Sequence, residues 1–236
     1  MRNVLLIATR EAYLLFATPT AWGLATFFQL LGGLLFCRAV LTAQYADLTG
    51  FYANGLAGLL VAVVPIAMMG RIAGERRAGT MELLLTSPIA AWELVWGKWL
   101  AALAFVGLLI VLSLQYPLIL TAYENPDRGQ WLPATAALAC EGALLAAIGL
   151  FASSLTSNSV LAGITAISLS VFLRLFQSLG SILGQESSPL FEGMSLSHRV
   201  LSMSRGVVDT RDIAYFAALT ILFLALAARG VESDRW

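Results

Sequence analysis

Six long apolar runs dominate this sequence, at residues 21–41, 52–74, 95–121, 132–155, 159–180 and 212–229. A helix that crosses a bilayer needs about 20 consecutive, mostly apolar residues. Hydrophobic residues make up 59% of the chain and charged residues 12%, so a water-soluble fold would expose a large apolar surface. The sequence therefore predicts an all-α polytopic membrane protein, a single domain over residues 1–236 with about six transmembrane helices.

The sixth run is the shortest of these spans. Its uninterrupted apolar core extends from Ile213 to Ala228, and we expect residues around Val207 and Val208 to complete the crossing. Between the fourth and fifth runs, the small polar residues from Ser153 to Ser159 predict a tight turn.

The distribution of Lys and Arg predicts the orientation, because cytoplasmic loops carry an excess of these residues. With the N-terminus inside, eight of the fourteen basic residues fall in cytoplasmic segments: Arg2, Arg10, Arg71, Arg76, Arg77, Lys98, Arg229 and Arg235. Both termini are then cytoplasmic, and residues 181–211 form the one long external segment. We expect the chain in the cell (inner) membrane, and its start does not resemble a cleaved signal peptide because Arg10 and Glu11 interrupt it.

Residues 1–19 predict an amphipathic helix that lies in the cytoplasmic interface. Arg2 and Asn3 stand seven residues before Thr9 and Arg10, so they share one helical face, and Pro19 breaks the helix. The alternative is that this segment merely extends the first span.

The segment from Glu75 to Lys98, ERRAGTMELLLTSPIAAWELVWGK, predicts two helix boundaries between the second and third spans. Gly79 can take the left-handed conformation that ends a helix, and Thr80 can then cap a short helix over Met81 to Thr86. Ser87 and Pro88 suit the N-cap and first position of the next helix, on which we expect Lys98 to snorkel toward water. A short helix held between two spans is a handle for a soluble partner; the alternative is a plain charged loop.

A resemblance to a known family supports the first of these interpretations. The pattern E-R-R-x-G-T-x-E-L-L-L-T-S-P, followed by E-L-x-x-G-K, resembles the coupling region of ABC-2-type transporter permeases. The N-terminal R-E-A-Y-L-L-F-A-T-P is similar to the interfacial helix of that family. The stretch that begins F-E-G-M-S-L-S-H-R-V resembles the external segment of permeases grouped with the gliding-motility GldF and the nitrous-oxide-reductase maturation NosY proteins.

The resemblance implies a permease subunit that couples ATP hydrolysis elsewhere to movement of its own spans, most simply for export. It implies two copies of a cytoplasmic ABC ATPase, a second or homologous permease, and membrane lipid as partners. The residues that would receive the ATPase's motion are Glu75, Arg76, Arg77, Gly79, Thr80, Glu82, Leu83, Leu84, Ser87 and Pro88.

No catalytic, metal or cofactor site is expected in this chain. It has no G-x-x-x-x-G-K-[ST] loop, so ATP and Mg²⁺ would be bound by the partner ATPase and the permease itself would not be an enzyme. The formal net charge of zero gives no reason to expect nucleic acid.

Two other functions remain open at this stage. The same fold could use ATP to move or assemble an envelope partner without carrying a solute, with an auxiliary subunit that has an extracytoplasmic domain. A secondary transporter would instead require charged relays on several spans and an inverted repeat. Only Glu141 and Arg174 qualify as charges at mid-membrane, and we expect them to pair, either along a translocation path or dimer interface or as a packing contact.

Overall fold

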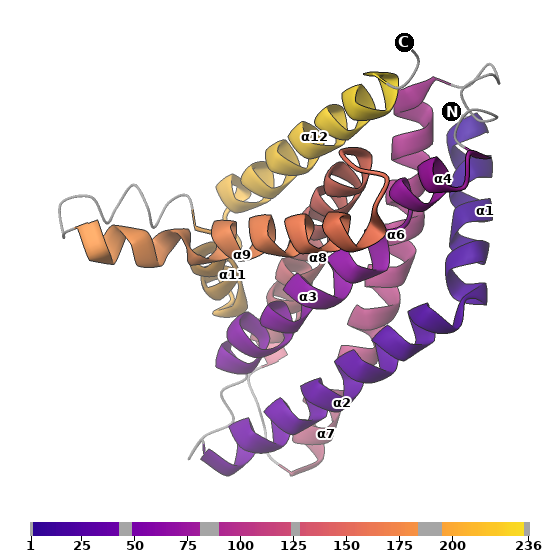
Figure 1. Ribbon diagram of the computed structural model, residues 1–236. Coiled ribbons are helices and arrows are strands. Elements are labelled where there is room, and N and C mark those ends of the chain that lie inside the picture. The colour runs from indigo at the N-terminus through magenta and orange to yellow at the C-terminus, as the bar shows by residue number, and fades with distance from the viewer. Residues whose placement is uncertain (1, 43–48, 81–89, 124–127, 184–194, 234–236) are drawn as a thin grey trace.

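The computed structural model describes residues 2–42, 49–80, 90–123, 128–183 and 195–233, and within these ranges the secondary structure is entirely helical. Figure 1 shows the helices in one bundle. Their order along the chain is α1 (Arg2–Ala17), α2 (Pro19–Thr42), the π-helix η1 (Phe51–Leu56), α3 (Ala57–Met68), α4 (Ala73–Arg77), α6 (Ala91–Ser113), α7 (Gln115–Tyr123), the 3-10 helix η2 (Arg128–Gln130), α8 (Trp131–Ser154), α9 (Ser159–Leu183), α11 (Leu196–Ser204) and α12 (Thr210–Glu232).

Six stretches in the described ranges are long and apolar enough to cross a membrane, which confirms the predicted all-α polytopic fold. They are Pro19–Leu41, Phe51–Arg77, Ala91–Thr121, Trp131–Ser154, Ser159–Phe176 and Thr210–Glu232. A short non-helical connection at residues 155–158 separates α8 from α9, where the small polar residues predicted a turn.

Helix α8 forms the centre of the bundle and packs against α3, α6, α9 and α12. In its most apolar window 67% of the residues are buried, compared with 22% for the windows of α2, α9 and α12. Small residues bring the helices close: a Cβ built on Gly149 of α8 would lie 2.7 Å from the Met68 side chain of α3. The outer helices therefore present their apolar side chains to the surroundings, as expected in a bilayer.

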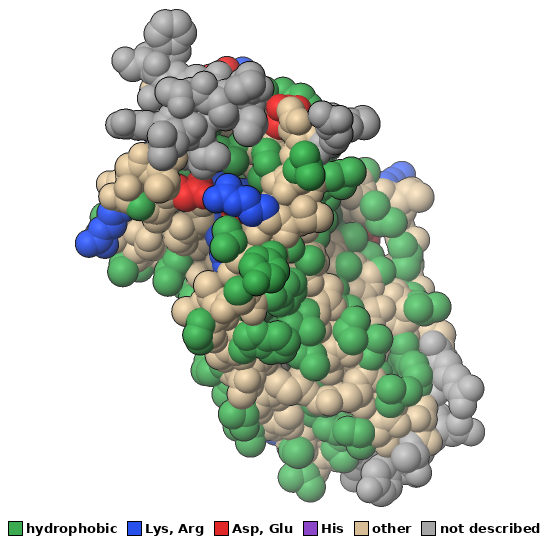
Figure 2. All heavy atoms as spheres, turned by 90° about the vertical axis from the view of Figure 1, so that its right-hand side faces the viewer, with side chains coloured by type: hydrophobic (Ala, Val, Ile, Leu, Met, Phe, Trp, Pro, Cys, Tyr) green, Lys and Arg blue, Asp and Glu red, His purple; other side chains and the backbone are tan. Residues whose placement is uncertain are grey.

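Helix α1 begins and α12 ends at the same end of the bundle, where α4 and the start of α6 also lie (Figure 1). We call this the terminal end. Figure 2, turned by 90°, shows hydrophobic side chains over the body of one face and charged side chains gathered toward the terminal end. This arrangement agrees with an even number of crossings.

Two helix boundaries differ from the sequence predictions. The sixth spanning helix begins at Thr210, capped by the Asp209 carboxylate, which accepts a hydrogen bond from the Arg211 amide at 3.0 Å. Val207 and Val208 precede this cap, so the expectation that they complete the span was wrong; the helix instead gains its length by continuing to Glu232.

The third spanning helix begins at Ala91, because Ala90 has an extended backbone, and not at Pro88 as predicted. The Glu93 carboxylate accepts a hydrogen bond from the Ala90 amide at 3.3 Å, which satisfies a donor at this N-terminus.

The predicted interfacial helix is α1, a helix separate from the first span. The chain bends at Thr18, whose hydroxyl donates to the Leu15 carbonyl at 2.7 Å, and Pro19 then starts α2 without an amide hydrogen to offer. Because α1 and α2 meet at an angle (Figure 1), α1 is not a simple extension of the first span. Its main packing partner is α6.

Candidate functional site

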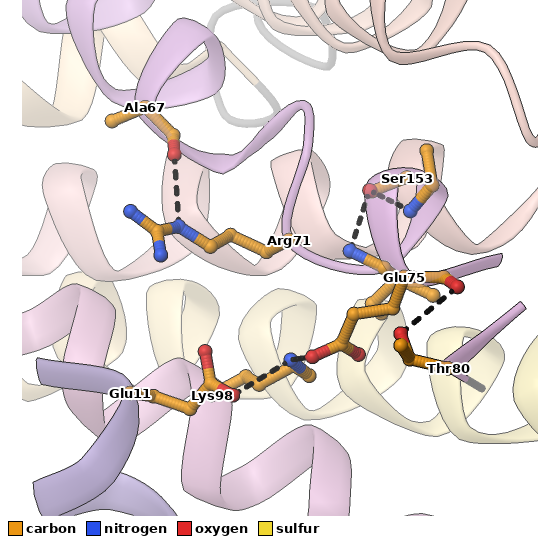
Figure 3. Close-up of polar contacts among 9 residues, drawn as sticks. Glu11, Ala67, Arg71, Glu75, Thr80, Lys98 and Ser153 are labelled. Atoms are coloured by element: carbon orange, nitrogen blue, oxygen red, sulfur yellow. Dashed lines mark hydrogen bonds and ion pairs between the residues drawn. The ribbon is translucent and has the colours of Figure 1, made fainter. Parts of the chain in front are cut away.

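A buried ion-pair network joins three helices at the terminal end (Figure 3). The Lys98 ammonium of α6 lies 3.0 Å from a carboxylate oxygen of Glu11 on α1 and 2.8 Å from one of Glu75 on α4. The exposed fraction is 1% for the Lys98 side chain, 6% for Glu11 and 22% for Glu75. One cation therefore holds together α1, the end of the second span and the start of the third.

The packing of α1 on α6 places these charges side by side. A Cβ on Gly97 would lie 2.6 Å from Cγ2 of Ile7, so only glycine allows α1 this close. One turn before Ile7, the side-chain amide of Asn3 donates a hydrogen bond to the Glu93 carboxylate at 3.4 Å. Asn3, Ile7 and Glu11 are four residues apart and share one face of α1, which is the face applied to α6.

A second cation lies near the two carboxylates. Arg71 belongs to the turn between α3 and α4, and its charge interacts with those of Glu11 and Glu75 at longer range than Lys98 (Figure 3). Two acidic and two basic groups thus balance within the cluster. This matters because a buried charge without a partner is strongly destabilising.

The hydroxyl of Ser153 fixes the turn that carries Arg71. It accepts hydrogen bonds from the backbone amides of Ile72 and Ala73, at 3.1 and 2.9 Å, and donates to the Met69 carbonyl at 2.9 Å. Ser153 stands near the C-terminal end of α8, so the central helix of the bundle holds the turn between α3 and α4. Any movement of α4 is therefore resisted by, or passed to, α8.

The predicted ATPase-coupling residues fall into two groups. Gly79 has a φ of +69°, the left-handed conformation expected of it, and the hydroxyl of Thr80 donates to the Glu75 carbonyl at 3.2 Å. Arg76 and Arg77 occupy the last turn of α4, with Arg77 exposed. Five others lie outside the described residues, together with the predicted helix over Met81 to Thr86: Glu82, Leu83, Leu84, Ser87 and Pro88.

The two intramembrane charges do meet, deep in the bundle. The Arg174 guanidinium of α9 forms an ion pair with the fully buried Glu141 of α8, and it also donates to the Ala53 carbonyl in η1. The Ser197 hydroxyl of α11 donates to the Arg174 carbonyl at 3.0 Å. Four elements meet at this arginine, and whether the pair serves a path or only packing stays a prediction.

Comparison with known proteins assigns the chain to a family. A model of the family described as ABC-2 family transporter protein matches residues 18–229. The chain belongs to this family. None of the curated proteins matches it. ABC-2 family membership indicates the permease subunit of an ABC transporter, a multi-pass membrane component that generally works with an ATPase subunit and is typically not catalytic itself. The match does not distinguish subtypes, so the GldF- and NosY-like assignment stays a prediction.

Sequence reasoning included Glu75 among the coupling residues but missed Lys98 and Glu11, its partners in this ABC-2 protein's network. We expected Lys98 to snorkel to water, and this was wrong, because it is 2% exposed and its ammonium faces two carboxylates. A lysine inside a predicted span and Glu11 within an apolar helix were the available signals, since both are costly in a membrane unless paired. Ser153 gave no signal beyond its place in a polar turn.

Proposed function

We propose that this ABC-2 family permease exports its substrate by using the motion of a separate cytoplasmic ATPase, which it receives at the terminal end. In this proposal the terminal end is cytoplasmic, two permease chains pair, and each rests on one ATPase subunit. ATP and Mg²⁺ are bound by the ATPase. The permease contributes a mechanical path from its cytoplasmic surface to its spans.

The observation that carries the proposal is the Lys98 ion-pair network. Segment 81–89 lies outside the described residues and contains half of the predicted coupling residues. It is flanked by α4 on one side and α6 on the other. Glu75 on α4 and Lys98 on α6 are joined directly, and Glu11 adds α1 to the same contact. A force applied to segment 81–89 therefore acts on α1, α4 and α6 together, and not on the ends of α4 and α6 separately.

The path continues into the bundle through Ser153. Because its hydroxyl holds the backbone at Met69, Ile72 and Ala73, a displacement of α4 also acts on α8. Helix α8 in turn packs against α3, α6, α9 and α12. The proposal thus assigns α8 the role of distributing movement to most of the spans.

The test begins with the partner. The tagged chain is purified from its native membranes, and the proposal predicts that an ATPase with a G-x-x-x-x-G-K-[ST] loop co-purifies. Glu82→Lys, which reverses a charge in the predicted coupling segment, is expected to abolish co-purification while membrane insertion is retained. Glu232→Lys, an exposed charge reversal at the end of α12, is the matched control and is expected to retain the ATPase.

Unchanged co-purification of the ATPase with the Glu82→Lys chain would contradict the assignment of the coupling segment. If no ATPase is recovered with the unmodified chain, the permease function itself is contradicted. A further co-purifying subunit with a large extracytoplasmic domain would favour the envelope-assembly function over export.

A further inference from the structure

A cavity of about 460 Å³ lies where the bend between α1 and α2 faces the end of the second span. One wall is apolar and includes Leu15, Leu24 and Ile66. The other carries Arg71 together with Thr18 and Thr20, at the first turn of α2. The cavity therefore combines an apolar wall with a cation and two hydroxyl groups.

The guanidinium of Arg71 has capacity for a further partner. Its Nε donates to the Ala67 carbonyl at 3.4 Å, and among the described residues neither Nη group forms a hydrogen bond. Figure 3 shows the guanidinium beside Ala67, with no dashed line from it to the Lys98 cluster. A guanidinium with free donors is the group that proteins most often use to bind phosphate in a planar, two-point contact.

Two threonine hydroxyls on the wall with Arg71 are hydrogen-bonded to each other and to the backbone. The Thr20 hydroxyl donates to that of Thr18 at 3.1 Å, and the Thr18 hydroxyl donates to the Leu15 carbonyl. The first turn of α2 lies at the end of the helix dipole that favours anions. Arg71 and the first turn of α2 therefore both favour a negatively charged ligand.

The depth of the cavity selects the source of that anion. The second candidate span ends at Arg77, so Arg71 lies near the terminal end of this span. Pro19 starts the first span at the same level, and Trp22, 55% exposed, follows it as a residue typical of the headgroup region. The cavity thus lies where lipid headgroups meet acyl chains.

We propose that this cavity binds the phosphate of an anionic phospholipid from the leaflet at the terminal end. Arg71 contacts the phosphate, the first turn of α2 faces it with the positive end of the helix dipole, and the acyl chain lies along the apolar wall. A bound phosphate adds negative charge on the side of Arg71 away from Glu11 and Glu75, so the lipid becomes electrostatically linked to the Lys98 network. The proposal does not depend on coupling to an ATPase.

The experiment counts lipids on the intact chain. Purified protein in a neutral detergent is titrated with phosphatidylglycerol or with phosphatidylcholine, and bound lipid is measured by native mass spectrometry. Two variants test the site: Arg71→Gln removes the charge, and Gly23→Leu fills the cavity, because a Cβ there meets no atom within 4 Å. Arg229→Gln, which removes an exposed charge from the last turn of α12, is the control.

We expect phosphatidylglycerol to bind more tightly than phosphatidylcholine, by about tenfold, because both lipids carry the same phosphate but only phosphatidylcholine adds a choline cation near Arg71. Both site variants are expected to lose that preference and the control to keep it. Gel filtration and thermal unfolding identify any variant that fails to fold. If Arg71→Gln fails to fold, Gly23→Leu still tests the site.

Three results would overturn the proposal. The first is an unchanged preference in Arg71→Gln. The second is a preference lost in Arg71→Gln but kept in Gly23→Leu, which would place the phosphate outside the cavity. The third is displacement of phosphatidylglycerol by millimolar glycerol 3-phosphate, which would show that the site takes a soluble phosphate ester and not a lipid.

Discussion

Replacing Lys98 by Met is the perturbation that the ion-pair network makes most informative. Methionine keeps most of the length and the apolar stem of the lysine but removes its charge. The Lys98 side chain is 1% exposed, and its loss leaves the Glu11 and Glu75 carboxylates facing each other without their shared cation. Removing one partner of a buried ion pair costs about 3–5 kcal/mol. The equilibrium constant for unfolding should then rise by a hundredfold to a few thousandfold.

The geometry also predicts an order among the three members of the network. Glu11→Gln leaves Lys98 paired with Glu75, so its cost should be about 1.5–3 kcal/mol, the typical value for one hydrogen bond to a charged group. Glu75→Gln should cost less than Glu11→Gln, because Glu75 is 22% exposed and Glu11 6%. The predicted order of destabilisation is therefore Lys98→Met, then Glu11→Gln, then Glu75→Gln.

The assay is denaturant-induced unfolding of the purified chain in detergent, followed by tryptophan fluorescence. Arg229→Met, which removes an exposed charge in the last turn of α12, is the control and should change the midpoint little. A Lys98→Met chain as stable as the unmodified protein, or more stable than Glu11→Gln, would refute the reasoning.

Three further predictions concern packing at the terminal end and in the centre of the bundle. Gly97→Leu should detach α1 and lower the free energy of unfolding by about 1–3 kcal/mol. Gly107→Leu on the same helix should not, because a Cβ there meets no atom within 4 Å. Limited proteolysis within α1 distinguishes the two variants. Ser153→Ala should cost about 1–3 kcal/mol in denaturant unfolding by leaving buried backbone groups unpaired, whereas Ser113→Ala, whose hydroxyl bonds within its own helix, should cost less. Glu141→Gln should lower the thermal unfolding temperature by weakening its ion pair with the arginine of α9, and an unchanged temperature would show that the pair does not stabilise packing.

Much of the architecture follows from local patterns in the sequence. The number of crossings was predictable because each span is an apolar run long enough to cross a bilayer by itself. The left-handed Gly79 and the break before Pro19 were predictable because they depend on the chemistry of one or two residues. The start of the third spanning helix was misplaced, because Pro88 permits a helix start without fixing it and Ala90 is extended.

The candidate site depends on contacts between distant residues, which no local pattern encodes. Lys98 is 87 residues from Glu11 and 23 from Glu75, and the three meet only because Gly97 lets α1 dock on α6. Ser153 binds backbone groups about 80 residues away, and backbone groups have no sequence signature. The network was therefore visible from the sequence only as charges placed where a membrane protein must pair them.

The most direct test of the central claim is hydrogen–deuterium exchange of the permease bound to its ATPase, with and without ATP. If the Lys98 network passes on the motion received at segment 81–89, ATP should change exchange in α1 as well as in residues 78–90. In Lys98→Met, the response of residues 78–90 should persist while that of α1 disappears. A response confined to residues 78–90 in the unmodified protein, or an α1 response unaffected by Lys98→Met, would contradict the account.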